Sequence, residues 1–159
     1  MKKKPKPRRW PKDQNVVALA MEHACIITKS RNDQFLLIEL DCIASLRSGH
    51  FSNQQWNMLI SLVNISEVMA KAGVGVEVVE PAKRAEIALA QIRARYQMTA
   101  EWKARPEEVD AISELHQYHN LQRTSITYGE YCKHVTKAEH LRIGGAALTY
   151  EEILRENGL

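Results

Sequence analysis

The longest pattern of apolar residues interrupted by regularly spaced polar ones lies between Ser52 and Ala72. Its polar residues recur at spacings of four, three, three and four, as they would along one stripe of an α-helix. These polar residues are Asn57, Ser61, Asn64, Glu67 and Lys71. Apolar side chains such as Trp56, Leu59 and Val63 occupy most of the remaining circumference. A helix of this kind is buried on several sides, so the pattern predicts the central helix of a small all-α domain.

The same periodicity predicts a single compact bundle of about six helices, followed by a short C-terminal helix. The expected ranges are 13–27, 34–48, 52–72, 81–98, 106–120, 127–143 and 149–157. Three starts carry a capping box, in which a Ser or Thr and a Gln or Glu three residues later satisfy the first backbone N–H groups: Ser52–Gln55, Thr127–Glu130 and Thr149–Glu152. Gly49, Gly73 and Gly144 follow the ends of helices, where glycine is favoured.

Spacing also predicts which side chains each helix buries. We expect Ser30, Asn32 and Asp33 to form a turn before the second helix. The buried side of that helix is predicted to be Leu36, Leu37, Leu40, Ile43 and Ala44. The helix from Pro106 is expected to bury Val109, Ile112, Leu115, His116 and His119 and to end before Leu121. Trp56 is predicted to be largely buried where the second, third and fourth helices meet.

Composition fits one globular domain, with 159 residues, 45% hydrophobic and 26% charged. Charge is unevenly distributed: residues 1–12 carry seven basic side chains and no acid, while the whole chain carries +3, so the rest carries 3 − 7 = −4. Lysine and proline alternate in this segment, which disfavours a helix. The sequence therefore predicts a disordered basic arm (1–12), a helical domain (13–143), and a glycine hinge with a short helix (144–159).

The three cysteines, Cys25, Cys42 and Cys132, are odd in number and widely spaced, each within a predicted helix. This spacing disfavours a disulfide framework and favours reduced cysteines in the cytoplasm. The apolar run from Val16 to Met21 is too short for a secretory signal, and no run approaches the length of a membrane span. We therefore expect a cytoplasmic protein without a membrane partner.

Candidate chemistry is sparse. His116 and His119 lie three residues apart on one helix, a spacing that suits a shared metal, but neither a carboxylate nor a cysteine stands at ligand spacing beside them. A packed, hydrogen-bonded role in the core is favoured for both. Cys132 and His134 point to different faces of their helix, which disfavours a nucleophile pair. We predict no catalytic residue, metal or cofactor, and a protein that is not an enzyme.

The basic arm is the most visible charged feature. Its cations, together with an aromatic ring that can stack on a base, suit a nucleic-acid backbone or an acidic partner. The residues concerned are Lys2, Lys3, Lys4, Lys6, Arg8, Arg9, Trp10 and Lys12.

A set of residues across positions 1–135 resembles a family of small phage and prophage proteins. The similarity rests on the arm Lys2–Trp10, Gln55–Trp56 through Leu62, Asn64–Ile65, Ala70, Gly73–Gly75, Glu77, Ala85, Ala88, Arg95–Tyr96, Trp102, Glu114–His116 and Thr127–Tyr131. The chain departs from the family by about three extra residues between His116 and Glu130, and from Gly144 onward it has no counterpart. The resemblance implies an accessory phage protein rather than a virion component or a replication enzyme.

The predicted function is therefore binding of a host or phage protein within the host bacterium, to alter that protein's activity in host takeover or counter-defence. The alternative is a nucleic-acid-binding regulator that uses the arm. The C-terminal helix is too short to be stable alone, so we expect it to dock on its own core or, in a homodimer, on a second subunit.

Overall fold

The structure is a computed structural model that describes residues 16–145 and 148–159. This part of the chain is all-α, and its only β-type pairing is an isolated bridge between Ile26 and Thr127. Its elements are α1 (Val16–Ala24), α2 (Lys29–Ser48), α3 (Asn53–Lys71), the 3-10 helix η1 (Val76–Val78), α4 (Val79–Thr99), α5 (Pro106–Ser125), α6 (Tyr128–Ile143) and α7 (Tyr150–Glu156). The basic arm and residues 146–147 lie outside the described residues.

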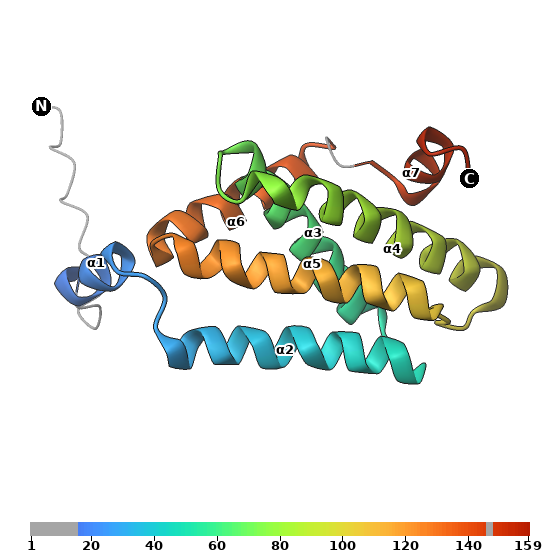
Figure 1. Ribbon diagram of the computed structural model, residues 1–159, viewed down its shortest axis with the longest axis horizontal. Coiled ribbons are helices and arrows are strands. Elements are labelled where there is room, and N and C mark those ends of the chain that lie inside the picture. Colours follow the sequence, from blue (N-terminus) through green and yellow to red (C-terminus); the bar gives the residue numbers. More distant parts are fainter. Residues whose placement is uncertain (1–15, 146–147) are drawn as a thin grey trace, which may run out of the picture.

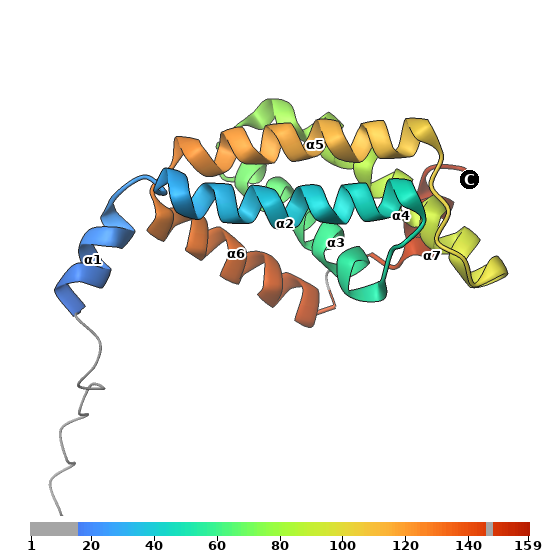
Figure 2. The same ribbon diagram turned by 90° about the horizontal axis from the view of Figure 1, so that it is seen from below.

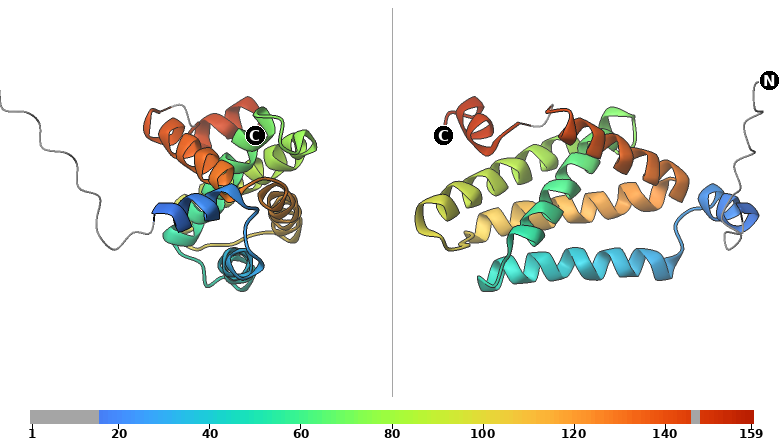
Figure 3. Two further views of the ribbon diagram at one scale, coloured as in Figure 1. Left: turned by 90° about the vertical axis from the view of Figure 1, so that its left-hand side faces the viewer. Right: turned by 180° about the vertical axis from the view of Figure 1, so that it is seen from behind.

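The long helices α2, α5 and α4 lie side by side, with α5 between the other two (Figure 1). Helix α3 crosses them obliquely on the far side of that view (Figure 3). Helix α6 packs against α3, and α1 projects beyond one end of the bundle (Figure 2). Helix α2 therefore lies at an edge of the bundle, where it contacts α3 and α5.

Helix α3 is central, as its pattern predicts, because it contacts α2, α4, α5 and α6. Leu59 and Val63 are buried in one continuous core to which α2, α4 and α5 contribute. Helical spacing places four residues of α4 on the side that faces the core, and all four are buried: Ala85, Ala88, Leu89 and Ile92.

Trp56 is less buried than expected. It packs against the core but remains half-buried, with the Arg93 guanidinium 5.2 Å from its ring centroid. The same guanidinium lies 5.6 Å from the ring of Trp102, which is buried and stacks on Tyr96 at 4.0 Å. Arg93 and Arg95 are both half-buried, and Arg95 pairs with Glu108. Their planar cations pack on rings or carboxylates while their stems cover apolar surface.

The three capping boxes form as the sequence predicts. The side chains of Ser52, Thr127 and Thr149 each accept a hydrogen bond from the backbone N–H three residues later. Gly49 ends α2 in the left-handed conformation at φ 78°. Local signals therefore determine these boundaries.

Other predicted boundaries are wrong. Helix α2 begins at Lys29 with Thr28 as its cap, so the expected turn residues Ser30, Asn32 and Asp33 lie inside the helix. Helix α1 ends at Ala24, which leaves Cys25 just beyond it. Helix α5 continues past Leu121 to Ser125, because Gln122 and Arg123 find buried partners. The start of α2 follows from a local cap, whereas α5 is extended by the tertiary contacts of Gln122 and Arg123.

Helix α7 docks on its own chain, against α4. Its Ile153 is buried, and Ala90 on the adjoining side of α4 is buried as well. The segment between the predicted glycine hinge and α7 includes residues 146 and 147 and so falls partly outside the described residues. Within this chain, the docking partner of the short helix is therefore α4.

No helix in the described ranges combines the length and the apolar character that crossing a bilayer requires.

Candidate functional site

A buried polar network joins α2 to α5 at the centre of the bundle. The Arg123 guanidinium donates to both carboxylate oxygens of Glu39, at 2.5 and 3.2 Å, and its Nε donates to Asn32 Oδ1 at 2.8 Å. Asn32 in turn donates to Asn120 at 2.9 Å, and His116 Nε2 lies 3.1 Å from Glu39 Oε2. The Arg123 residue has 0% exposure, so this is a fully desolvated ion pair.

The surroundings of Glu39 hold its carboxylate in the charged form. Burial alone would raise the pKa of Glu39, but contacts with His116 and Arg123 outweigh burial and lower this pKa to about 2. Leaving either partner of such a pair alone in the interior is costly, because a buried charge without a counter-charge retains its full desolvation penalty. The pair therefore ties α2 to α5.

His119 extends the network toward α3 and α6. Ser66 donates its hydroxyl hydrogen to Leu62 O at 2.8 Å, so at its 2.8 Å contact with His119 Nδ1 it must accept. His119 Nε2 is then the acceptor for the Tyr131 hydroxyl, 3.2 Å away. Burial lowers the pKa of His119 to about 3. The imidazole is neutral at pH 7, with its proton on Nδ1.

This buried network is suited to stabilising the bundle and not to binding a substrate. The side chains of Glu39, His116, His119 and Arg123 are all buried, and a substrate would reach them only if the bundle opened. The structure places His116 and His119 in the core, where the sequence analysis expects them. Among the described residues, no group of three or more His, Cys, Asp or Glu is arranged to hold a metal ion.

Sequence reasoning missed Glu39 and Arg123. A signal for Arg123 was available, since it lies four residues after His119 and seven after His116 on the same helical face. Glu39 interrupts an apolar run, and its position within that run gives no sign that it points inward.

The side of α2 that faces away from the bundle exposes apolar residues beside the charged Asp41. Leu37 is 69% exposed and Leu40 is 50% exposed, although both were predicted to be buried. Together with the exposed Ala44 they follow the i, i+3, i+7 spacing of one helical face, and we call these three residues the outer face of α2. The predicted orientation of α2 is therefore wrong: of the five positions expected inside, only Ile43 is fully buried.

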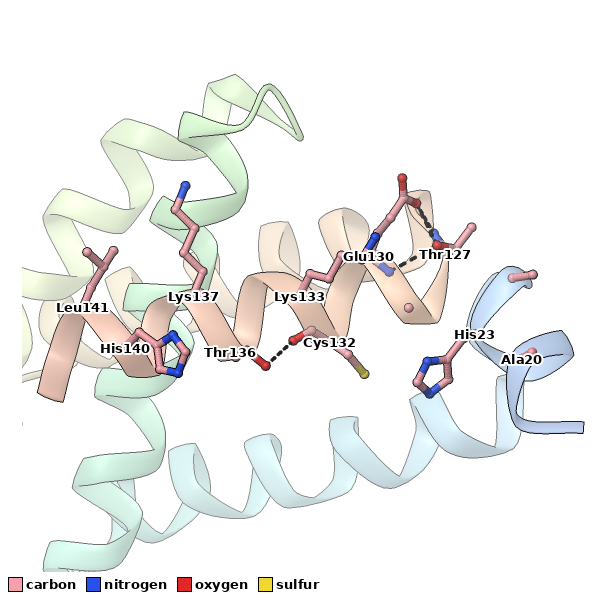
Figure 4. A pocket seen from close by; sticks show the side chains of 12 residues that line it. Ala20, His23, Thr127, Glu130, Cys132, Lys133, Thr136, Lys137, His140 and Leu141 are labelled. Atoms are coloured by element: carbon pink, nitrogen blue, oxygen red, sulfur yellow. Dashed lines mark hydrogen bonds between the residues drawn. The ribbon is translucent and has the colours of Figure 1, made fainter. Parts of the chain in front are cut away.

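A second feature is an open groove of about 860 Å³ between α1 and α6. His23 of α1 and Cys132 of α6 lie at one part of it, and Lys137 and His140 lie further along α6 (Figure 4). Thr136 donates its hydroxyl to the carbonyl oxygen of Cys132 at 3.0 Å, so that hydroxyl is engaged within the helix.

Comparison with protein-family models, with curated proteins and with solved structures finds no match to this chain.

Proposed function

We propose that this chain is a phage-encoded accessory protein that binds a host or phage protein and changes its activity, with the outer face of α2 as its contact surface. The phage assignment rests on the resemblance of residues 1–135 described above. Host takeover and counter-defence are the biological settings in which such a binder would act.

The observation that carries the proposal is the polarity of α2. This helix turns Glu39 and Asn32 into the protein and turns Leu37 and Leu40 outward. Burying one leucine fully is worth about 1.5–3 kcal/mol, so two exposed leucines in adjoining turns leave a substantial free energy to be gained by covering them. Contiguous apolar surface of this kind marks protein contacts more often than isolated exposed leucines do.

Binding is favoured over catalysis because Glu39 and His119, whose pKa values are lowered to about 2 and about 3, are both in the interior. Catalytic groups need contact with a substrate, whereas Glu39 and His119 contact only other buried side chains of the network. The exposed surface of α2 offers apolar contact, which suits a protein partner.

The test is capture of the tagged full chain's partner from host lysate, followed by the double substitution Leu37→Lys and Leu40→Lys. Lysine has nearly the helix propensity of leucine, so α2 should remain folded. We expect at least about ten-fold weaker binding to the captured protein. Met98→Lys is the matched control, because Met98 is 86% exposed on α4 and lies outside the outer face of α2. Equal binding by both variants would refute the proposed surface.

The alternative function is nucleic-acid binding through the arm, and the salt dependence of the affinity distinguishes it from protein binding. For duplex DNA, a plot of the logarithm of the binding constant against the logarithm of the salt concentration has a slope of about −0.9 for each phosphate contacted. Four contacts therefore give a slope of roughly −3.6. Deleting residues 2–9 would abolish such binding, whereas capture through α2 would survive both this deletion and nuclease. Tight, arm-dependent gel shifts at physiological salt would favour the alternative.

A further inference from the structure

The groove between α1 and α6 has a mainly apolar floor. Ala20 and Ala24 contribute to it from α1, and Gly129, Cys132 and Leu141 contribute from α6. From Gly129 to Leu141 the groove follows α6 for about 18 Å, given the rise of an α-helix. This length suits about three turns of a partner helix.

Contacts near the end of α1 and the start of α6 hold the two walls together. Tyr128 N donates to Cys25 O at 2.9 Å, and the rings of His23 and Tyr128 meet edge to face at 5.5 Å. A Cβ on Gly129 would lie 2.7 Å from the carbonyl oxygen of His23, so glycine is needed for this close approach. From this junction α1 and α6 diverge, which opens the groove (Figure 2).

Positive charge borders the groove. Lys133 and Lys137, one turn apart on α6, are both exposed and line it. Glu130 is the one carboxylate among the described residues of the lining, and it accepts a hydrogen bond from Thr127 N as part of the cap. The lining thus carries 2 − 1 = +1, counting histidines as neutral. The seven basic residues of positions 1–12 precede α1, which forms the other wall.

We propose that this groove binds an acidic amphipathic helix of a partner protein. The apolar side of that helix would lie on the floor of small residues, and its carboxylates would face Lys133 and Lys137. A nucleic-acid backbone fits less well, because only Lys133 and Lys137 would meet its phosphates and the apolar floor would stay uncovered. The site is separate from the outer face of α2, so it adds a second contact surface to the proposed function.

The probe is a fluorescent peptide of about 16 residues, or about 24 Å as a helix, with leucine along one face and glutamate elsewhere. A second peptide has lysine in place of every glutamate, and a duplex DNA of similar length is the third probe. Titrated with the full chain, the acidic peptide should bind about ten-fold more tightly than the other two probes, and added salt should weaken its binding. Equal binding of the acidic and basic peptides, tighter binding of DNA, or no acidic-peptide binding by about 1 mM would overturn the proposal.

Two variants locate the binding. The double variant Lys133→Gln with Lys137→Gln should bind the acidic peptide at least about five-fold more weakly. Lys71→Gln with Lys83→Gln removes the same charge from α3 and α4 and should leave affinity within about two-fold. In a Cys25→Ser background, saturating acidic peptide should slow thiol labelling of Cys132, which lines the groove. Equal effects of the two lysine pairs, or unchanged labelling of Cys132, would refute binding at this groove.

Discussion

The inner and outer sides of α2 differ: the inner side buries a charged pair beside the apolar residues Cys42, Ile43 and Leu46, and the outer side exposes two leucines. The inner side places Glu39 and Asn32 against Arg123, in a network with no exposed member, whereas the outer side presents Leu37 and Leu40 to solvent. The inner side contributes to the stability of the bundle, since its charges are compensated only when α2 and α5 are together. The outer side contributes little to the isolated chain, and its apolar surface is free for a partner. If the proposed function holds, stability and recognition are separated on one helix.

The largest expected effect is on the inner side. Glu39→Leu leaves the buried Arg123 charge without its carboxylate and should lower the free energy of unfolding by about 3–5 kcal/mol. That is a large part of the roughly 5–15 kcal/mol typical of a domain. Urea denaturation followed by circular dichroism measures the change.

The control is the double variant Glu39→Leu with Arg123→Met, which removes both charges. Replacing a complete buried pair with apolar groups is often neutral, so this variant should recover at least about 2 kcal/mol relative to Glu39→Leu alone. A double variant as unstable as the single one would show that the unpaired charge on Arg123 does not cause the loss of stability in Glu39→Leu. The inner side of α2 would then not stabilise the bundle through its ion pair.

Acid should weaken the same network. The pKa of His119 is lowered from 6.5 to about 3 in the folded state, so below pH 6.5 the unfolded chain binds a proton that the folded chain does not. Stability from this group is complete above pH 6.5 and is lost as pH falls toward 3, at up to about 1.4 kcal/mol per pH unit. Glu39, lowered from 4.5 to about 2, adds a loss of the same sign below pH 4.5.

Urea midpoints measured between pH 7 and pH 5 exclude Glu39, because its carboxylate is ionised in both states over most of this range. Burial also lowers the pKa of His134, so the share of His119 is found by comparison with a variant. His119→Gln retains a polar side chain but no titrating group, so its stability should vary less with pH over the same interval. An identical pH dependence in this variant would assign the acid sensitivity to other groups.

The smallest effect on stability is expected on the outer side. Leu37→Lys with Leu40→Lys should change the free energy of unfolding by no more than about 0.5 kcal/mol per substitution, because exposed positions make few contacts and the helix propensities match. Leu46→Ala, on the buried side of the same helix, should cost about 2–5 kcal/mol in the same assay. A large loss from the lysine pair would mean that the outer face is packed within the protein itself.

The position and length of α3 were predictable because both depend on local and near-local signals. Its polar stripe, the Ser52 cap and the glycines after Lys71 together define one buried helix, and the structure agrees with each of them. Trp56 is the exception: its burial depends on how closely Arg93 approaches from α4, which the pattern of α3 does not contain.

The candidate sites were much less predictable. The apolar residues of α2 fit more than one helical face, and the tertiary structure selects the face that lets Glu39 meet Arg123, 84 residues away in the chain. The groove beside α6 depends on how closely Gly129 approaches the backbone of His23, which no spacing in the sequence indicates.

The sequence by itself determined the all-α class, the central helix, the three capping boxes and the histidine-bearing face of α5. These follow from hydrogen bonds and periodicities that span a few residues. The tertiary structure decided which side of α2 points inward, where α5 ends and where α7 docks, because each depends on contacts between segments far apart in the chain. The inward side of α2 carries Cys42, Ile43 and Leu46 together with Glu39, and Glu39 can be buried there because Arg123 meets it in the folded bundle.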